Sequence, residues 1–117
     1  KDLLRLEREV YIFLSMIETT VGRSVLRSAI NEYGSPESDI YFLKESGRFM
    51  SHLLQNLRIA IRGLANIGSM DCIPSLEAVK TREEVFQRLK KDKAHRDQSR
   101  LISEWVDEAV KIIKFRA

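Results

Sequence analysis

The segment from Leu57 to Val79 constrains the fold of this chain more than any other. Its first part has apolar and small residues at helical spacing and stops at Gly68, where we expect the helix to end. Asp71 stands where it can cap a second helix, and Pro74 falls in the first turn of that helix, where a missing N–H costs little. The pattern predicts an αα-hairpin that turns at residues 68–70 and buries one face against a neighbouring hairpin. Such an arrangement favours a helical interaction domain over an enzyme.

The composition is that of one globular domain. The chain has 117 residues, of which 44% are hydrophobic and 32% are charged. Only 5 glycines and 2 prolines interrupt it, which favours long helices. We therefore expect residues 1–117 to form a single helical domain. Helix-like sequence at both ends is compatible with a piece of a longer protein.

The first helical stripe has alternating spacings of three and four and consists of Leu3, Leu6, Val10, Phe13 and Ile17. Leu4, Tyr11 and Leu14 widen it, which predicts a helix with more than one neighbour. Gly22 then marks either a bend or a true break before helical spacing resumes.

The clearest boundary lies at residues 33–37, where Gly34 suits a helix end and Ser35 and Pro36 suit the next helix start. From Ile40 to Leu64 one apolar spacing continues without interruption. It fits one long helix, or two helices broken near Gly47 or Ser51.

The C-terminal third predicts at least one more helix. Thr81 and Glu84 have the spacing of a capping box, which would restart a helix there. The last helix is expected at about Asp97 to Phe115. It carries two adjacent lines of residues: Leu101, Trp105, Glu108 and Ile112 form one, and Ile102, Val106, Ala109 and Ile113 form the other. We expect Trp105 to be buried in the core together with Ile102, Leu64, Ile67 and Leu76.

These patterns predict an all-α fold of four to six helices. No segment shows sustained period-two alternation, so we expect essentially no sheet. Stacked αα-hairpins are the first interpretation. A four-helix bundle is the alternative, favoured if residues 36–67 form one helix.

The residues Leu64, Ile67, Gly68, Ile73, Pro74 and Leu76 give the chain a resemblance to a HEAT repeat. In that family the first helix ends in a similar Leu/Ile-Gly, and the second opens with Ile-Pro-x-Leu after a turn that contains Asp. The chain departs from the family in having no second clear copy and a long link at residues 80–100. The resemblance implies that one helical face binds a partner protein.

A second resemblance rests on residues 19–25, TTVGRSV, and on residues 101–105, LISEW. Both are similar to short sequence motifs of the TFIIS N-terminal helical domain. In that family the two motifs lie close together in the sequence, whereas here they are far apart. This resemblance implies binding of short peptide motifs in transcription factors.

Groups that carry catalysis are scarce. The two histidines, His52 and His95, stand apart from each other, and the single cysteine, Cys72, is interpreted as a small hydrophobe packed in the hairpin. Zinc-ligand spacing, a phosphate-binding loop and a nucleophile motif are all missing from the sequence. We therefore expect a protein that is not an enzyme and that needs no metal or cofactor.

Two basic groups are candidates for partner binding. Arg58 and Arg62 lie one helical turn apart with no acid between them, so they can hold a carboxylate-rich segment. The second group lies between residues 80 and 100 and includes Arg88, Lys90, Lys91, Lys93, Arg96 and Arg100, with acidic residues interspersed.

The predicted function is protein–protein interaction with an acidic or amphipathic partner segment. The alternative is binding of nucleic acid or another acidic surface through residues 80–100. The formal charge of +3 is small. One cysteine favours a reducing compartment, and neither a membrane-spanning run nor a signal peptide is visible. We expect an intracellular protein, cytoplasmic or nuclear, that does not enter the membrane.

Overall fold

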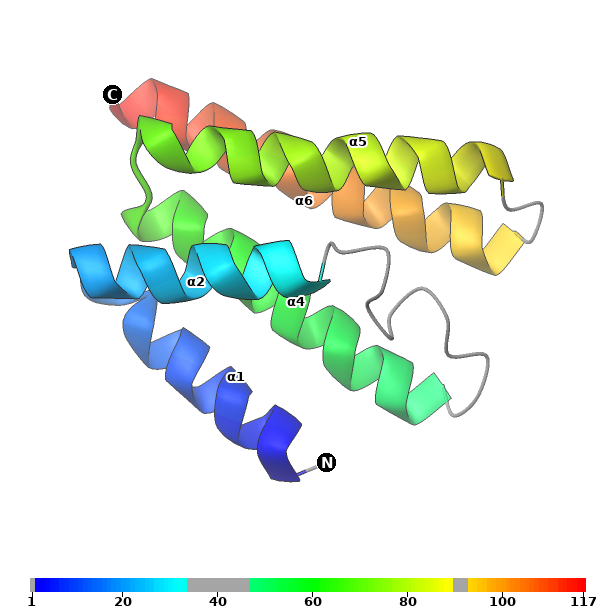
Figure 1. Ribbon diagram of the computed structural model, residues 1–117, viewed down its shortest axis with the longest axis horizontal. Helices are drawn as coiled ribbons and strands as arrows, with labels where there is room; N and C mark the ends of the chain where they lie inside the picture. Colours follow the sequence, from blue (N-terminus) through cyan, green and yellow to red (C-terminus); the bar gives the residue numbers. More distant parts are fainter. Residues whose placement is uncertain (1, 34–46, 90–92) are drawn as a thin grey trace.

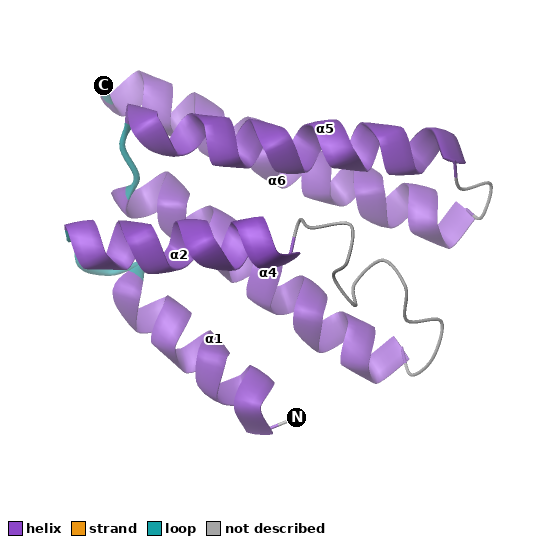
Figure 2. Cartoon of the chain, viewed as in Figure 1, coloured by secondary structure: helices purple, strands orange, loops and turns teal. Residues whose placement is uncertain are grey.

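The computed structural model describes the backbone of residues 2–33, 47–89 and 93–117, and the side chains of residues 3, 5–32, 54–85 and 96–117. In this described part there are five α-helices, one short 3-10 helix and no strand, so the all-α prediction is confirmed (Figures 1 and 2). The α-helices are α1 (Asp2–Leu14), α2 (Thr20–Tyr33), α4 (Gly47–Ile67), α5 (Ile73–Leu89) and α6 (Lys93–Arg116), and the 3-10 helix is η1 (Met70–Cys72).

The helices form two layers in a slab of 38 × 31 × 18 Å (Figure 1). α4 is central, because it packs against α1, α2 and α6. α5 lies against α6, and α2 also contacts α5, so the N-terminal and C-terminal halves share one core. The core residues include Leu26, Ile30, Leu57, Ile61, Leu64, Leu76, Ile102 and Val106, all with 0% exposure.

The predicted hairpin is confirmed, although its turn is built differently from the expectation. α4 ends at Ile67 and the chain reverses through η1 into α5. Gly68 does not have the left-handed backbone that often follows a helix end. Glycine is required there because a Cβ would overlap the carbonyl oxygen of Leu64, to which the Gly68 N–H donates a 2.6 Å hydrogen bond.

Asp71 does not cap α5, so that prediction is wrong. The extended residue Ser69 precedes η1, and its carbonyl accepts a 2.9 Å hydrogen bond from the Cys72 N–H. Asp71 lies inside η1, where its carboxylate accepts a hydrogen bond from the Ser69 hydroxyl. Pro74 is in the first turn of α5, as expected.

The C-terminal end of α4 is held by arginines from two other helices. Arg23 of α2 donates a 3.3 Å hydrogen bond to the carbonyl of Ile67. Arg116 of α6 donates to the carbonyl of Ala65 at 2.5 Å and also to the carbonyl of Gly68. These carbonyls belong to the last turn of α4 and its first following residue, which have no partner within the helix.

The break between the first two helices lies before Gly22. Thr19 caps the start of α2, because its hydroxyl accepts a 2.9 Å hydrogen bond from the Gly22 N–H and its carbonyl accepts one from the Arg23 N–H. Gly22 itself is a buried residue inside α2.

The long central helix is continuous from Gly47 to Ile67. The alternative of two helices broken near Ser51 is therefore wrong. The predicted boundary at residues 33–37 and the spacing from Ile40 to residue 46 fall mainly outside the described residues.

The predicted capping box at Thr81 and Glu84 is also wrong, since α5 runs through both residues. The Thr81 hydroxyl instead donates a 3.0 Å hydrogen bond back to the carbonyl of Glu77, which is compatible with a helix interior. α6 begins at Lys93, four positions before the expected start at Asp97.

Candidate functional site

The two adjacent lines of residues on α6 have different surroundings. The line that contains Ile102 and Val106 is buried in the core. The other line is at the surface beside α4, with Leu101 43% and Ile112 40% exposed. Trp105 belongs to this second line and is half-buried at the edge of the core, so the prediction that it lies inside the core is wrong.

The matching surface of α4 carries the predicted arginine pair. Arg58 and Arg62 are exposed on one side of α4, while Leu57, Ile61 and Leu64 are buried on the other. This division follows from the 3.6-residue period of the helix. The structure therefore places both arginines next to the surface line of α6.

Between these surfaces lies a shallow depression that we call the α4–α6 groove. Its wider part has a volume of about 320 Å³ and is lined by Leu54, Gln55, Arg58, Leu101 and Trp105. A narrower part of about 30 Å³ is lined by Arg62, Ala65, Trp105, Glu108, Ala109 and Ile112. Trp105 lines both parts, so the indole ring is at the middle of the groove.

Arg58 lies over the ring of Trp105. Its guanidinium carbon lies 5.9 Å from the centroid of the Trp105 ring, which is within the range of a cation–π contact. Among the described residues, no carboxylate forms an ion pair with Arg58 or Arg62. Glu108 lines the same narrow part as Arg62, so the groove has one acidic wall. The groove thus combines an apolar floor with two cationic side chains.

The second predicted basic group is only partly described. Arg100 forms an ion pair with Asp97 at 3.0 Å, and Arg96 is exposed and has a partner of its own. The side chains of Arg88, Lys90, Lys91 and Lys93 lie outside the described residues.

Lys80, at the start of the basic stretch, forms an ion pair with Asp107 at 2.6 Å. This hydrogen bond raises the pKa of Lys80 above its ordinary value. The described members of the stretch are therefore interspersed with carboxylates, as the sequence suggested.

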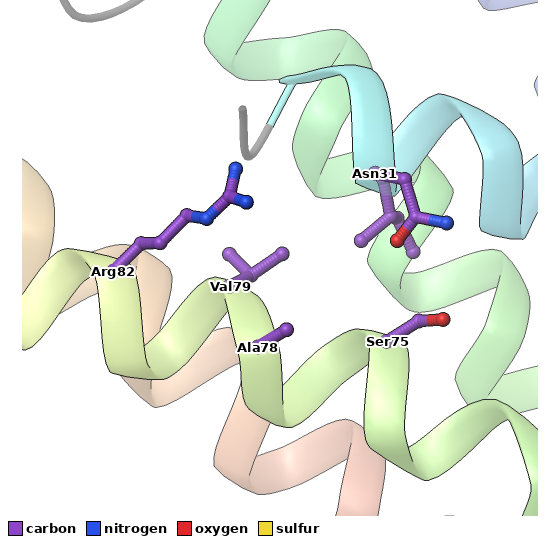
Figure 3. Close-up of a pocket in the computed structure, with 6 residues that line it drawn as sticks. Asn31, Ser75, Ala78, Val79 and Arg82 are labelled. Carbon is purple, nitrogen blue, oxygen red and sulfur yellow. The ribbon is translucent and has the colours of Figure 1, made fainter. Parts of the chain in front are cut away.

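Sequence reasoning missed a second hollow, between α2 and α5 (Figure 3). It has a volume of about 120 Å³ and is lined by Ile30, Asn31, Ser75, Ala78, Val79 and Arg82. Asn31 lies on α2 across from Ser75 and Arg82 on α5 (Figure 3). Because the two helices are far apart in the sequence, no spacing pattern could have joined these residues.

The groups with catalytic potential do not converge in the described part of the chain. Cys72 is 1% exposed, in agreement with its interpretation as a small packed hydrophobe. The side chains of His52 and His95 lie outside the described residues. No group of three histidine, cysteine, aspartate or glutamate side chains that could hold a metal is found among the described residues.

None of the described helices combines the length and the apolar character that a membrane crossing requires. Comparison of the chain with protein-family models, with curated proteins and with solved structures found no match.

Proposed function

We propose that this chain is a non-catalytic protein–protein interaction domain, with a scaffold or adaptor role, whose α4–α6 groove binds an acidic amphipathic segment of a partner protein. The observation that carries the proposal is the cation–π contact of the Arg58 guanidinium with the half-buried ring of Trp105, in a groove that also contains Arg62. The HEAT-like residues around Gly68 support the same class of function, because HEAT-like domains usually present one helical face to a partner protein.

The groove offers two kinds of contact. Trp105 and Leu101 provide an apolar surface on which a large side chain of the partner can be desolvated. Arg58 and Arg62 present planar forks of N–H donors, which bind carboxylates in a bidentate manner. Tryptophan and arginine are the residue types most enriched among the energetically dominant positions of protein interfaces.

The nucleic-acid alternative finds less support in the described residues. A phosphate-binding face needs cations without carboxylates among them. Arg100 is paired with Asp97 and Lys80 with Asp107, so both positive charges are already compensated.

The proposal is tested by titration of the protein with a synthetic amphipathic peptide whose apolar residues are leucine and whose polar residues are glutamate. Trp105 is the only tryptophan, so its fluorescence reports on the groove alone. We expect a saturable change in emission with the glutamate peptide and none with a matched lysine peptide. The double variant Arg58→Glu/Arg62→Glu should lose this response, whereas the control variant Arg5→Glu on α1 should keep it.

A response that is unchanged in the double variant overturns the proposal, and so does the absence of any response. A parallel titration with a nonspecific oligonucleotide distinguishes the alternative. The alternative is supported if the oligonucleotide binds strongly at low salt and weakly at physiological salt, while the glutamate peptide gives no response. That result would assign the function to the basic stretch instead.

A further inference from the structure

The two walls of the α4–α6 groove carry opposite charges. Arg58 and Arg62 stand on the α4 wall, and both are exposed. On the α6 wall, Glu108 lines the narrow part of the groove. Glu104 lies one helical turn before Glu108 and three residues after Leu101, and both glutamates are exposed. The groove therefore has a cationic side and an anionic side.

These two sides do not neutralise each other. Among the described residues, none of the two arginines and two glutamates takes part in an ion pair. The apolar residues Leu101, Trp105 and Ile112 line the groove from which the charged side chains project. An occupant that pairs with both sides must therefore carry charges of both signs, one on each side of an apolar surface.

The length of the groove indicates the shape of its occupant. The wider part includes Leu54 and Leu101, and the narrower part includes Ala65 and Ile112, so α4 and α6 run in roughly the same direction along it (Figure 1). From Leu101 to Ile112 the groove is about 16 Å long, at 1.5 Å per helical residue. About three turns of a helix match this length. An extended segment would need a strand edge to pair with, and the described part of the chain has no strand.

We infer that the groove binds a partner helix whose apolar seam has acidic residues along one flank and basic residues along the other. The inference rests on the proposed function and narrows the acidic occupant to one whose charges are segregated. Its acidic flank faces Arg58 and Arg62, and its basic flank faces Glu104 and Glu108. A helix with acids on both flanks would bring carboxylates against these glutamates, and this repulsion disfavours it.

The apolar residues provide the affinity, and the charges select the partner. Leu101 and Ile112 are both exposed, so a leucine seam on the partner can cover them and exclude water. Ion pairs at the rim of such a contact add modest affinity, whereas like charges brought together are costly. We therefore expect the groove to discriminate by the placement of charge on the partner and not by its total charge.

The test compares three labelled helical peptides that share one leucine seam and one staple on the outer face. The segregated peptide carries glutamate along one flank and lysine along the other. The mixed peptide has the same composition, with the two residues alternating on each flank, and the glutamate peptide has glutamate on both flanks. Fluorescence anisotropy should show saturable binding of the segregated peptide, about ten-fold tighter than that of either other peptide.

Matched variants locate the anionic side. Glu104→Lys/Glu108→Lys, at exposed positions, should reverse the preference, so that the glutamate peptide binds more tightly than the segregated peptide. The control Glu9→Lys/Glu32→Lys makes the same change of net charge at exposed positions on α1 and α2, and it should keep the preference of the wild type. The melting temperature of both variants should stay close to that of the wild type.

The outcomes separate this inference from the proposed function. If the glutamate peptide binds through Arg58 and Arg62 but the segregated peptide binds no more tightly, the inference is overturned and the proposed function stands. If neither peptide binds, both are overturned. Equal affinity for the segregated and mixed peptides also overturns the inference, as does an unchanged preference in Glu104→Lys/Glu108→Lys.

Sedimentation equilibrium examines a second copy of this chain as the occupant. We expect the same molecular mass with and without a saturating amount of the segregated peptide, apart from the mass of the peptide itself. A dimer that the segregated peptide dissociates would place a second copy in the groove and overturn the inference.

Discussion

The guanidinium carbon of Arg58 lies 5.9 Å from the centroid of the Trp105 ring and connects α4 to α6 outside the buried core. The contact places a cation near the half-buried ring, where the N–H groups of the guanidinium can still meet solvent or a ligand. In the core of the same two helices, Ile61 and Leu64 of α4 and Ile102 of α6 are fully buried.

Charge reversal in the groove should change stability little. Arg58 is exposed, so Arg58→Glu removes a cation–π contact worth about 0.5–1 kcal/mol and no ion pair among the described residues. Urea unfolding should give a free energy of unfolding lower by about 1 kcal/mol or less. A loss of several kcal/mol would mean that Arg58 supports the fold and that its binding variants are uninformative.

Truncation of core and groove residues should have unequal effects. Leu64 is 0% exposed, and Leu64→Ala should lower the free energy of unfolding by about 2–5 kcal/mol. Trp105→Ala should cost less, because part of the ring already faces water. Urea titrations followed by far-UV circular dichroism measure both. Equal costs would place Trp105 in the core after all.

Gly68→Ala should destabilise the domain by about 1 kcal/mol or more, although Gly68 has no left-handed backbone. The added Cβ would overlap the carbonyl oxygen of Leu64, which is backbone and cannot move aside without disturbing the end of α4. Thermal melts of Gly68→Ala and of the control Met70→Ala, at an exposed position in the same turn, check the prediction. An unchanged melting temperature for Gly68→Ala contradicts it.

Arg116→Met should lower the free energy of unfolding by about 1 kcal/mol, because two carbonyls at the end of α4 lose a donor. Arg116→Lys should recover only part of this, since an ammonium group cannot reproduce the planar fork. Lys114→Met, an exposed change on the same helix, is the control. If it costs as much as Arg116→Met, the carbonyl contacts contribute nothing.

Asp71 should make stability depend on pH in the acid range. The Ser69 hydroxyl, and then the charge of Arg27 at 3.8 Å, lower the pKa of Asp71 below its ordinary value of 3.8. The stabilisation is present above 3.8 and is lost as the pH falls through the lower pKa of the folded state. The melting temperature of the wild type should exceed that of Asp71→Asn at neutral pH, and this difference should vanish in strong acid. A difference that stays constant to the lowest pH argues against the linkage.

The hairpin was predictable because the residues that end its first helix and start its second act locally. Gly68 weakens the continuation of a helix, and Pro74 has a fixed φ and no N–H, so the end of one helix and the start of the next are visible in the sequence. Thr81 shows the limit of such signals. A threonine hydroxyl can cap a helix or bond back to the preceding turn, and the neighbouring packing decides between the two.

The rotation of each helix was not predictable. On α6 the lines that begin at Leu101 and Ile102 have similar spacing, and only the position of α4 decides which one is buried. On α1 the more regular stripe is exposed, while Tyr11 on another face enters the core. The spacing of apolar residues predicts that a helix has an apolar face. Which element packs against that face depends on the whole fold.

The arginine pair of the candidate site was visible from its spacing, whereas its aromatic neighbour was not. Arg58 and Arg62 lie one turn apart on a single helix, so their proximity is a local property. Trp105 joins them through the packing of α6 on α4, which depends on the intervening hairpin.

The arginines at the end of α4 have a consequence for how the molecule opens. Arg23 comes from α2 and Arg116 from α6, and both bond to carbonyls within a few residues of Ile67. If α2 or α6 detaches, carbonyls at the end of α4 lose an arginine donor, and these carbonyls lie next to the ones held by the other helix. The amides of the last turn of α4 should therefore exchange with deuterium only when the N-terminal and C-terminal halves separate together, as one cooperative unit.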